Sequence, residues 1–161
     1  MDSIQRIKKI LSGVTDPEIP VLTIEDMGIL KDIRLTENQL TITITPTYTG
    51  CPAMDMIEVN IKAALQEAGY AHVEVISVLS PAWTTDWMTE EGKKKLKEYG
   101  IAPPEGTAAG ISSILGRGVT PRCPFCDSKN SELISHFGST PCKALYRCKD
   151  CLEPFDYFKC I

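Results

Sequence analysis

The sequence of 161 residues has no uninterrupted apolar run approaching the ~20 residues that a helix needs to cross a bilayer. Its first residues, 1–5, lack the basic and apolar segments of a secretory signal peptide. It also lacks an excess of basic residues, because 17 Lys and Arg stand against 21 Asp and Glu, a net charge of −4. We therefore expect a cytoplasmic protein without a broad basic field for binding nucleic-acid phosphates.

Motifs that mark several enzyme classes are absent as well. The sequence contains no glycine-rich phosphate loop, no nucleophile elbow and no H-E-x-x-H pair. It also contains no E-x-x-H pair of the kind that di-iron bundles carry. We therefore expect a chain that does not carry out oxygen chemistry by itself.

The sequence does contain seven cysteines, and six of them lie between Cys123 and Cys160. In a chain expected to stay in a reducing compartment, thiols act as metal ligands or reactive groups rather than as disulfides. With 43% hydrophobic and 24% charged residues, the chain has the composition of a globular protein with one main domain, or one domain plus a small appendage.

Hydrophobic periodicity predicts a first domain of mixed helix and strand. The pattern gives a helix over 2–12, strands over 29–36 and 40–45, a helix over 53–68 and a strand over 73–79. The first two strands are expected to pair as a β-hairpin with one buried face. The last strand is apolar on both alternating faces, and so we expect a covered inner strand that follows a helical crossover. The predicted fold class is α+β, a small α/β-like sheet with helices.

The second half of the chain predicts a helix, a linker and a small second domain. Acids early and bases late indicate a solvated helix over 90–99. Prolines, glycines and small residues dominate 101–120, which is typical of a linker. The predicted division is therefore a first domain over 1–100, a linker over 101–120 and a C-terminal domain over 121–161.

Two Cys-x-x-Cys pairs give the clearest chemical signal. Cys123 and Cys126 are followed, after 21 intervening residues, by Cys148 and Cys151. Two such tight turns can complete a tetrahedron of sulfurs around one ion, with metal–sulfur distances of about 2.3 Å. The spacing predicts a zinc ribbon whose closed site is structural and supplies much of this short domain's folding free energy. Two independent redox pairs are a less favoured alternative, because neither pair lies in a βαβ context.

Cys142 and Cys160 lie outside these pairs. Each could be a buried packing residue, a substitute ligand or part of a second site, and packing is favoured because free cysteine is commonly buried. The basic residues of this domain are few and are interspersed with acids. We therefore favour protein docking over nucleic-acid binding as the role of the ribbon.

Cys51 stands between Gly50 and Pro52, at the predicted start of the helix over 53–68. Unpaired amides and the helix dipole at such a position favour a thiolate, which is nucleophilic and binds soft metals. A buried, inert cysteine is the alternative. Asp16 and Glu18 offer two carboxylates on a loop with two prolines, although such residues more often cap helices or form turns.

Several segments resemble known families. Residues 14–20 (VTDPEIP), the predicted hairpin and residues 47–52 (TYTGCP) resemble the MIP18 (DUF59) domain family, whose members assist iron–sulfur cluster assembly. A second set of segments closely resembles the PaaD (PaaJ) family, whose members are associated with the bacterial phenylacetyl-CoA epoxidase. These segments are residues 80–88, 99–104, 137–140, 142–148 and 155–160. The ending Cys160-Ile161 departs from the pattern of that family, which puts a terminal ligand role for Cys160 in doubt.

The resemblance implies an accessory component of a multicomponent monooxygenase in aerobic phenylacetate degradation, not itself the oxygenase. Its partners would be the oxygenase and reductase components, and it would help to mature a metal centre of that system. In this role Cys51 would contact or transfer iron or an iron–sulfur cluster, with Asp16 and Glu18 shaping its surroundings. The alternatives are a structural component with no iron role and, less favoured, a zinc-ribbon protein that binds nucleic acid.

Overall fold

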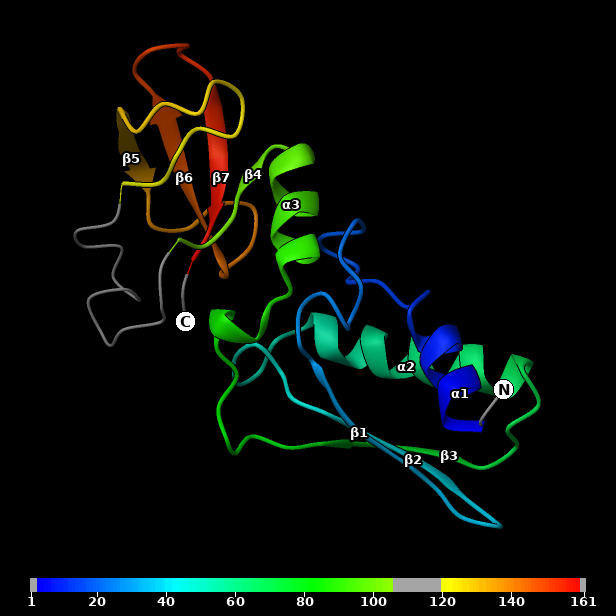
Figure 1. Ribbon diagram of the computed structural model, residues 1–161. Coiled ribbons are helices and arrows are strands. Elements are labelled where there is room, and N and C mark those ends of the chain that lie inside the picture. The colour runs from blue at the N-terminus through cyan, green and yellow to red at the C-terminus, as the bar shows by residue number, and fades with distance from the viewer. Residues whose placement is uncertain (1–2, 106–119, 160–161) are drawn as a thin grey trace. The chain divides into compact units, whose positions relative to one another are not determined.

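The computed structural model describes residues 3–105 and 120–159. They fall into two compact units, unit 1 up to Trp83 and unit 2 from Thr84 onward (Figure 1). Each unit has its own sheet, with three strands in unit 1 and four in unit 2.

The sheet of unit 1 contains β1 (Leu30–Leu35), β2 (Leu40–Ile44) and β3 (Val73–Ser77), in the order β1-β2-β3. β1 and β2 form an antiparallel hairpin, and β2 pairs with β3 in parallel. Along β2, buried and half-buried side chains alternate, because successive side chains of a strand point to opposite faces. The predicted hairpin and the predicted parallel crossover are both confirmed.

Two helices cover the buried face of this sheet (Figure 1). α1 (Ser3–Leu11) buries Ile7 and Leu11, and α2 (Ala53–Glu67) is the crossover between β2 and β3. The stripe of α2 that faces inward consists of residues three or four positions apart, which helical geometry places on one side: Met54, Ile57, Ile61 and Leu65. Within the described parts of the chain, no helix is both long enough and apolar enough to cross a membrane.

β3 differs from the prediction for its residues. It is an edge strand rather than a covered inner one, and its side chains are half-buried or exposed. Ile76 is 40% exposed and Leu79, just beyond the strand, is 59% exposed. The central strand is β2. Its alternating Thr residues are typical of a strand with one exposed face, so the sequence did not indicate that β2 is central.

Unit 1 ends at an anchored tryptophan. Trp83 is buried, and its Nε1 donates a hydrogen bond of 2.7 Å to the carbonyl oxygen of Met27. This bond joins segments that are 56 residues apart in the sequence. The chain that leaves β3 is therefore fixed to the loop that precedes β1.

Unit 2 combines a helical segment with the C-terminal strands. Its elements are a short 3₁₀ helix (Thr85–Trp87), α3 (Glu90–Glu98), β4 (Ile101–Ala102), β5 (Ser131–Ser135), β6 (Lys143–Cys148) and β7 (Pro154–Phe158). The strand order is β4-β7-β6-β5, with β4 parallel to β7 and the other pairs antiparallel. Thr89 caps α3, since its side chain accepts a hydrogen bond from the amide of Gly92.

The boundary between the units lies earlier than the sequence indicates. Residues 84–100 were expected in the first domain and 101–120 in a linker, yet α3 and β4 belong to unit 2. Leu96 of α3 is fully buried, and Ile101 pairs with Asp156 of β7. A strand of two residues next to Pro103 gives no periodic signal that sequence reasoning could detect. The rest of the predicted linker, residues 106–119, lies outside the described residues.

Gly100 makes the turn from α3 into β4. Its φ is +90°, a conformation that costs a residue with a Cβ about 1–2 kcal/mol. A Cβ at this position would also lie 3.3 Å from Cζ of Phe125, whose ring packs over the glycine. The turn thus joins the helical segment to the first Cys-x-x-Cys loop of unit 2.

Substitution of Gly100 should test this turn. We expect Gly100→Ala to destabilise unit 2 by about 2 kcal/mol, because strain at positive φ adds to a close approach to Phe125. Gly69→Ala is the matched control, since Gly69 has a φ of +101° with no atom within 4 Å of the added Cβ. It should cost about 1 kcal/mol, in unit 1. Native-state hydrogen exchange reads each unit separately, and equal losses in both variants would contradict the role of the Phe125 contact.

Candidate functional site

Two tight turns at one end of the β6–β7 hairpin carry the paired cysteines. In the first, the amide of Asp127 donates to the carbonyl oxygen of Cys123 at 2.9 Å. In the second, the amide of Cys148 donates to the carbonyl oxygen of Glu153 at 3.0 Å. Each pair is followed by a residue at positive φ, Asp127 at 63° and Leu152 at 66°. The two Cys-x-x-Cys pairs thus share a backbone conformation as well as a sequence spacing.

The four sulfurs converge. Sγ of Cys123 lies 3.7 Å from Sγ of Cys151, and Sγ of Cys126 lies 3.5 Å from Sγ of Cys148. All four lie within 4.8 Å of one another. A tetrahedral ion with bonds of about 2.3 Å requires sulfur–sulfur distances of about 3.8 Å. The donor set and its spacing therefore fit a metal ion bound by four thiolates.

The sulfurs differ in their surroundings. The pKa of Cys148 is lowered to about 7, chiefly by the backbone amide of Cys151, whose nitrogen lies 3.5 Å from Sγ of Cys148. Burial raises the pKa of Cys123, which is fully buried between the strands. The surroundings of Cys148 thus favour its thiolate, whereas burial disfavours the thiolate of Cys123.

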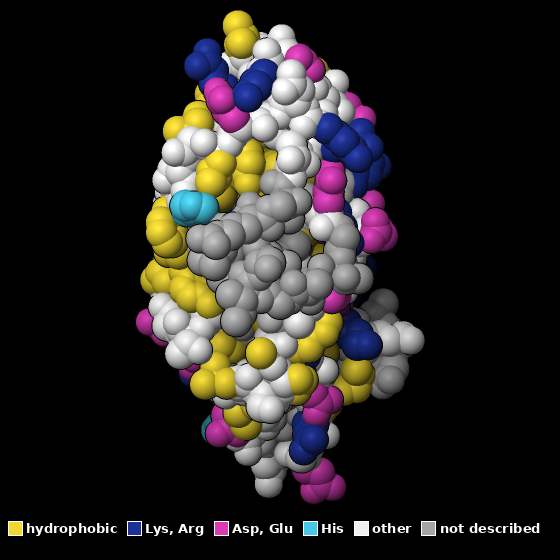
Figure 2. Space-filling model, turned by 90° about the vertical axis from the view of Figure 1, so that its left-hand side faces the viewer, with side chains coloured by type: hydrophobic (Ala, Val, Ile, Leu, Met, Phe, Trp, Pro, Cys, Tyr) yellow, Lys and Arg dark blue, Asp and Glu magenta, His cyan; other side chains and the backbone are white. Residues whose placement is uncertain are grey.

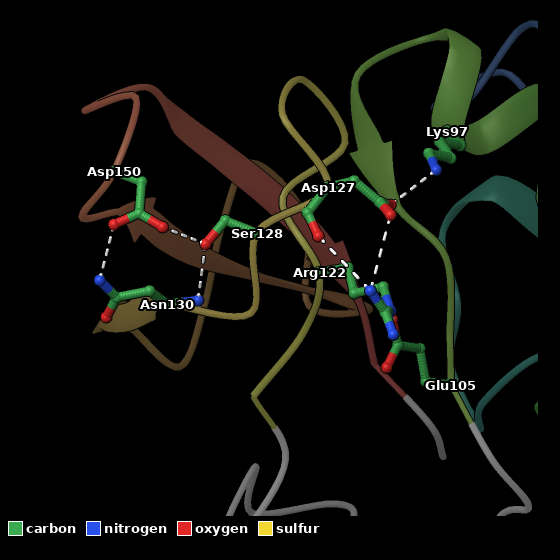
Figure 3. Close-up of polar contacts among 7 residues, drawn as sticks. All are labelled: Lys97, Glu105, Arg122, Asp127, Ser128, Asn130 and Asp150. Carbon is green, nitrogen blue, oxygen red and sulfur yellow. Dashed lines mark hydrogen bonds and ion pairs between the residues drawn. The ribbon is translucent and has the colours of Figure 1, made fainter.

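A polar network ties the two turns together (Figure 3). The carboxylate of Asp150, between Cys148 and Cys151, accepts hydrogen bonds from the hydroxyl of Ser128 and, at 2.8 Å, from Nδ2 of Asn130. These two bonds lower the pKa of Asp150. The amide of Asn130 in turn donates to Oγ of Ser128 at 3.0 Å. The network holds the loop after the first pair against the second pair.

Ion pairs connect the helical segment to the first turn (Figure 3). Nζ of Lys97, on α3, lies 2.9 Å from Oδ1 of Asp127. Arg122 lies 3.7 Å from the carboxylate of Glu105 and 3.5 Å from that of Asp127. The hydrogen bond and the charge of Lys97 lower the pKa of Asp127. The residue that ends the first Cys-x-x-Cys turn is therefore also a contact point for α3.

Cys142 is not part of the four-sulfur group. It is buried, and its Sγ lies 3.0 Å from the hydroxyl oxygen of Thr140. This burial agrees with the packing role favoured from the sequence. Cys160 lies outside the described residues.

Cys51 lies in the loop that leads from the carboxyl end of β2 into α2. Its side chain is half-buried, and its Sγ accepts a hydrogen bond of 3.8 Å from the hydroxyl of Thr47. Gly50 precedes it at a φ of +78°, and the carbonyl oxygen of Cys51 accepts from the amide of Met54 at 3.2 Å. The thiol therefore lies at the start of a helix, where the sequence predicts it, in a residue that is neither fully buried nor fully exposed.

Asp16 and Glu18 have a different surrounding from that of Cys51. Asp16 is buried, and its Oδ1 accepts hydrogen bonds from the amides of Glu18 and Ile19 at 2.7 and 2.9 Å. Asp16 thus orders the backbone of its own loop. In the described parts of the chain, the ribbon cysteines are the one group of three or more Cys, His, Asp or Glu ligand atoms close enough to share an ion. The two carboxylates and Cys51 do not form such a group.

Three residues that support these sites were not identified from the sequence. Thr47 could have been found, because it lies four residues before Cys51 in the same short loop. Asp150 also carried a signal, since it lies inside the second Cys-x-x-Cys pair. Lys97 carried no such signal. It is a lysine on a helix predicted to be solvated, and the sequence does not show that it pairs with Asp127, 30 residues away.

Family models cover both parts of the chain. Residues 4–78 match the model described as "Iron-sulfur cluster assembly protein", and residues 110–159 match "PaaD zinc beta ribbon domain". The first match covers nearly all of unit 1. The second covers the strands and turns that bring the four sulfurs together.

Similar proteins fall into two groups. A protein from Escherichia coli K12, provisionally named as the D component of 1,2-phenylacetyl-CoA epoxidase, is 49% identical over 98% of this chain and 93% of its own length. A Bacillus subtilis protein named Fe-S protein maturation auxiliary factor YitW is 36% identical over 55% of this chain and 88% of its own length. The crystal structure of a DUF59 domain from Bacillus anthracis, 29% identical, superposes with a TM-score of 0.53 over 57% of this chain and 89% of that one. The comparisons support the predicted fold class and both of the family resemblances.

The four-sulfur group predicts one metal ion per chain, held by unit 2. We expect Cys126→Ser to lose the ion, since three thiolates and a hydroxyl bind it far more weakly, and to lose the hydrogen-exchange protection of β5 to β7. Cys142→Ser, a change at a buried cysteine outside the group, should retain the metal. Elemental analysis of the two purified variants checks this, and equal metal content in both would contradict the assignment.

The Lys97–Asp127 pair predicts a pH dependence. Because the pKa of Asp127 is lowered in the folded state, the pair stabilises unit 2 above the ordinary pKa of an aspartate. That stabilisation is lost as the pH falls through the lowered pKa. We expect Lys97→Ala to raise the pKa of Asp127 in a carboxyl NMR titration, and Lys94→Ala, on the same helix, to leave it unchanged. A shift in both variants would indicate a general effect of charge.

Proposed function

The chain belongs to the family of the PaaD component of 1,2-phenylacetyl-CoA epoxidase. We propose that it is an accessory protein of that epoxidase system in phenylacetate degradation. In this role it assists assembly of an iron–sulfur or other metal centre of the system. One observation carries the proposal. A unit of the iron–sulfur cluster assembly family, with a half-buried thiol at the start of a helix, is joined in one chain to a four-cysteine ribbon. In this proposal the chain is not an enzyme, and its partners are the oxygenase and reductase components.

Cys51 is the residue that contacts iron or a cluster as cargo. The half-buried thiol can meet a soft metal, and the Thr47 hydroxyl donates a hydrogen bond to its sulfur. A single thiolate does not satisfy the iron atoms of a cluster, which take four cysteine ligands between them. The contact is therefore transient, and the other ligands come from the protein that supplies or receives the centre.

The ribbon has a structural and docking role in this proposal. Cys123, Cys126, Cys148 and Cys151 hold zinc, because four thiolates at these spacings are typical of structural zinc sites. The ion organises the turns and leaves no open position for a substrate. Large hydrophobic side chains are exposed at the turns, with Phe125 57% and Leu152 60% exposed. These side chains suit contact with another protein rather than with nucleic-acid phosphates.

Asp16 and Glu18 have a supporting role. Asp16 fixes the loop that leads toward β1 through two amide hydrogen bonds, so that it shapes unit 1 rather than supplying a ligand. Glu18 lies in the same turn, and its backbone amide donates one of the two hydrogen bonds to Asp16. In the proposal, this loop shapes the surroundings of Cys51 indirectly, by ordering unit 1.

Replacement of Cys51 tests the proposed function. In cells that express the epoxidase components, we expect Cys51→Ser to reduce cluster occupancy of the reductase component, or metal occupancy of the oxygenase component, to the level of cells without this protein. Thr47→Val should give an intermediate loss, because it removes the hydrogen bond to Sγ and keeps the thiol. Occupancy is measured by iron analysis and visible absorbance of the purified components.

Cys142→Ser is the control, because it removes a buried thiol far from Cys51 in the sequence and should leave occupancy unchanged. If Cys51→Ser behaves like this control while the protein still co-purifies with the oxygenase at a fixed ratio, the chain is a structural component of the assembly. That outcome would refute a role in metal-centre assembly.

A further inference from the structure

The Cys51 site is incomplete within one chain. Among residues 3–105 and 120–159, no second cysteine or histidine joins Cys51 in a group of three ligand atoms that could share an ion. An iron–sulfur cluster needs four protein or exchangeable ligands. If Cys51 contacts such a centre, the surface around it must meet another molecule that brings the missing ligands.

That surface is the end of unit 1 at which β2 and β3 both finish. The two strands are parallel, and the amide of Val78 donates to the carbonyl oxygen of Ile44 at 2.9 Å. The loop after β2 carries Cys51, and α2 begins there. The segment after β3 runs past the same end to the buried Trp83. Ligands of sheets with parallel strands bind at such carboxyl ends.

Two segments that reach this end of unit 1 carry no charge, and the start of β1 lies beside them, because Leu30 pairs with Ile44. Residues 38–54 contain no Asp, Glu, Lys or Arg, and neither do residues 75–85, in a chain that is 24% charged. Large hydrophobic side chains protrude here, with Met56 at the end of the first turn of α2 50% exposed and Leu79, in the second segment, 59% exposed. The lower part of Figure 2, which contains unit 1, shows hydrophobic side chains gathered in the middle of this face and charged ones toward its edges.

We propose that this surface, defined by Cys51, Met56 and Leu79 and called the Cys51 end, docks a different protein that presents its own cysteines to the centre. The inference rests on the proposed function and adds the location and chemistry of the contact. Met56 and Leu79 supply apolar contacts around the thiol and exclude water from it. The cysteines of the partner complete the ligand set that Cys51 begins.

The charges of unit 1 favour a different protein over a second copy of this chain. Residues 1–83 contain 6 Lys and Arg against 11 Asp and Glu. Asp55, one turn after Cys51, lies in the first turn of α2 and is exposed. Two copies that met through the Cys51 end would bring two units of net negative charge, and the Asp55 of each, together, which is unfavourable. A partner with basic residues around an apolar centre would complement them.

The experiment measures binding of the full chain to purified apo forms of the epoxidase reductase and oxygenase components. We expect the double substitution Met56→Gln and Leu79→Gln to weaken binding to one of them by about tenfold or more, as loss of central apolar contacts does. The same variant should reduce that component's metal-centre occupancy in cells. Leu35→Gln is the matched control, because Leu35 is a 40% exposed leucine at the opposite end of the sheet.

The outcomes separate this inference from the proposed function. Cys51→Ser tests the proposed function through occupancy, which it should fail to restore because it lacks the ligand, whereas the double substitution tests the surface through binding. If the double substitution binds and restores occupancy like Leu35→Gln, the docking surface is wrong even when the Cys51→Ser result supports assembly. If sedimentation instead reveals a dimer of this chain that the double substitution dissociates, the occupant is a second copy and the inference is overturned.

Discussion

Four thiolates within 4.8 Å of one another repel each other electrostatically. A cation bound between them attracts all four, and its binding free energy stabilises the folded unit 2. The same cysteines are part of the apolar core. Cys123 and Cys148 are fully buried and pack with Tyr146, which stacks on Phe155 at 6.0 Å and meets Tyr157 edge-on at 5.8 Å. Because ligands and core side chains share the same strands, metal binding and core formation are one event.

The two cysteine environments differ in how closely other thiols surround the sulfur. In unit 2 every thiol of the pairs faces the other three, so that the site is closed and inert. In unit 1 Cys51 is half-buried at a helix start and has a hydroxyl donor, Thr47, at its sulfur. A closed site suits a stable scaffold, whereas an open thiol with few competitors suits a ligand that must be released.

The sequence was sufficient where patterns are local and repeated. Period-3.6 and period-2 hydrophobicity identified α2, the β1–β2 hairpin and the parallel crossover, and the Cys-x-x-Cys spacing identified residues that converge in space. Sequence patterns were not sufficient where the place of a strand in the sheet determines how exposed its side chains are. The residues of β3 look like an inner strand, yet pairing on one side alone leaves Ile76 and Leu79 exposed. The sequence patterns also placed α3 and β4 outside the C-terminal unit, because their attachment depends on contacts such as that of Lys97 with Asp127.

The parallel pairing of β4 with β7 has a consequence for the order in which the protein forms during synthesis. Ile101 leaves the ribosome long before its strand partner Asp156, which lies near the end of the chain. Unit 1 has all its strands translated by Ser77 and can fold as the rest is made. Unit 2 must wait with β4 unpaired until β7 has emerged. During synthesis the chain therefore passes through a stage in which the first unit can be folded while the second is still open.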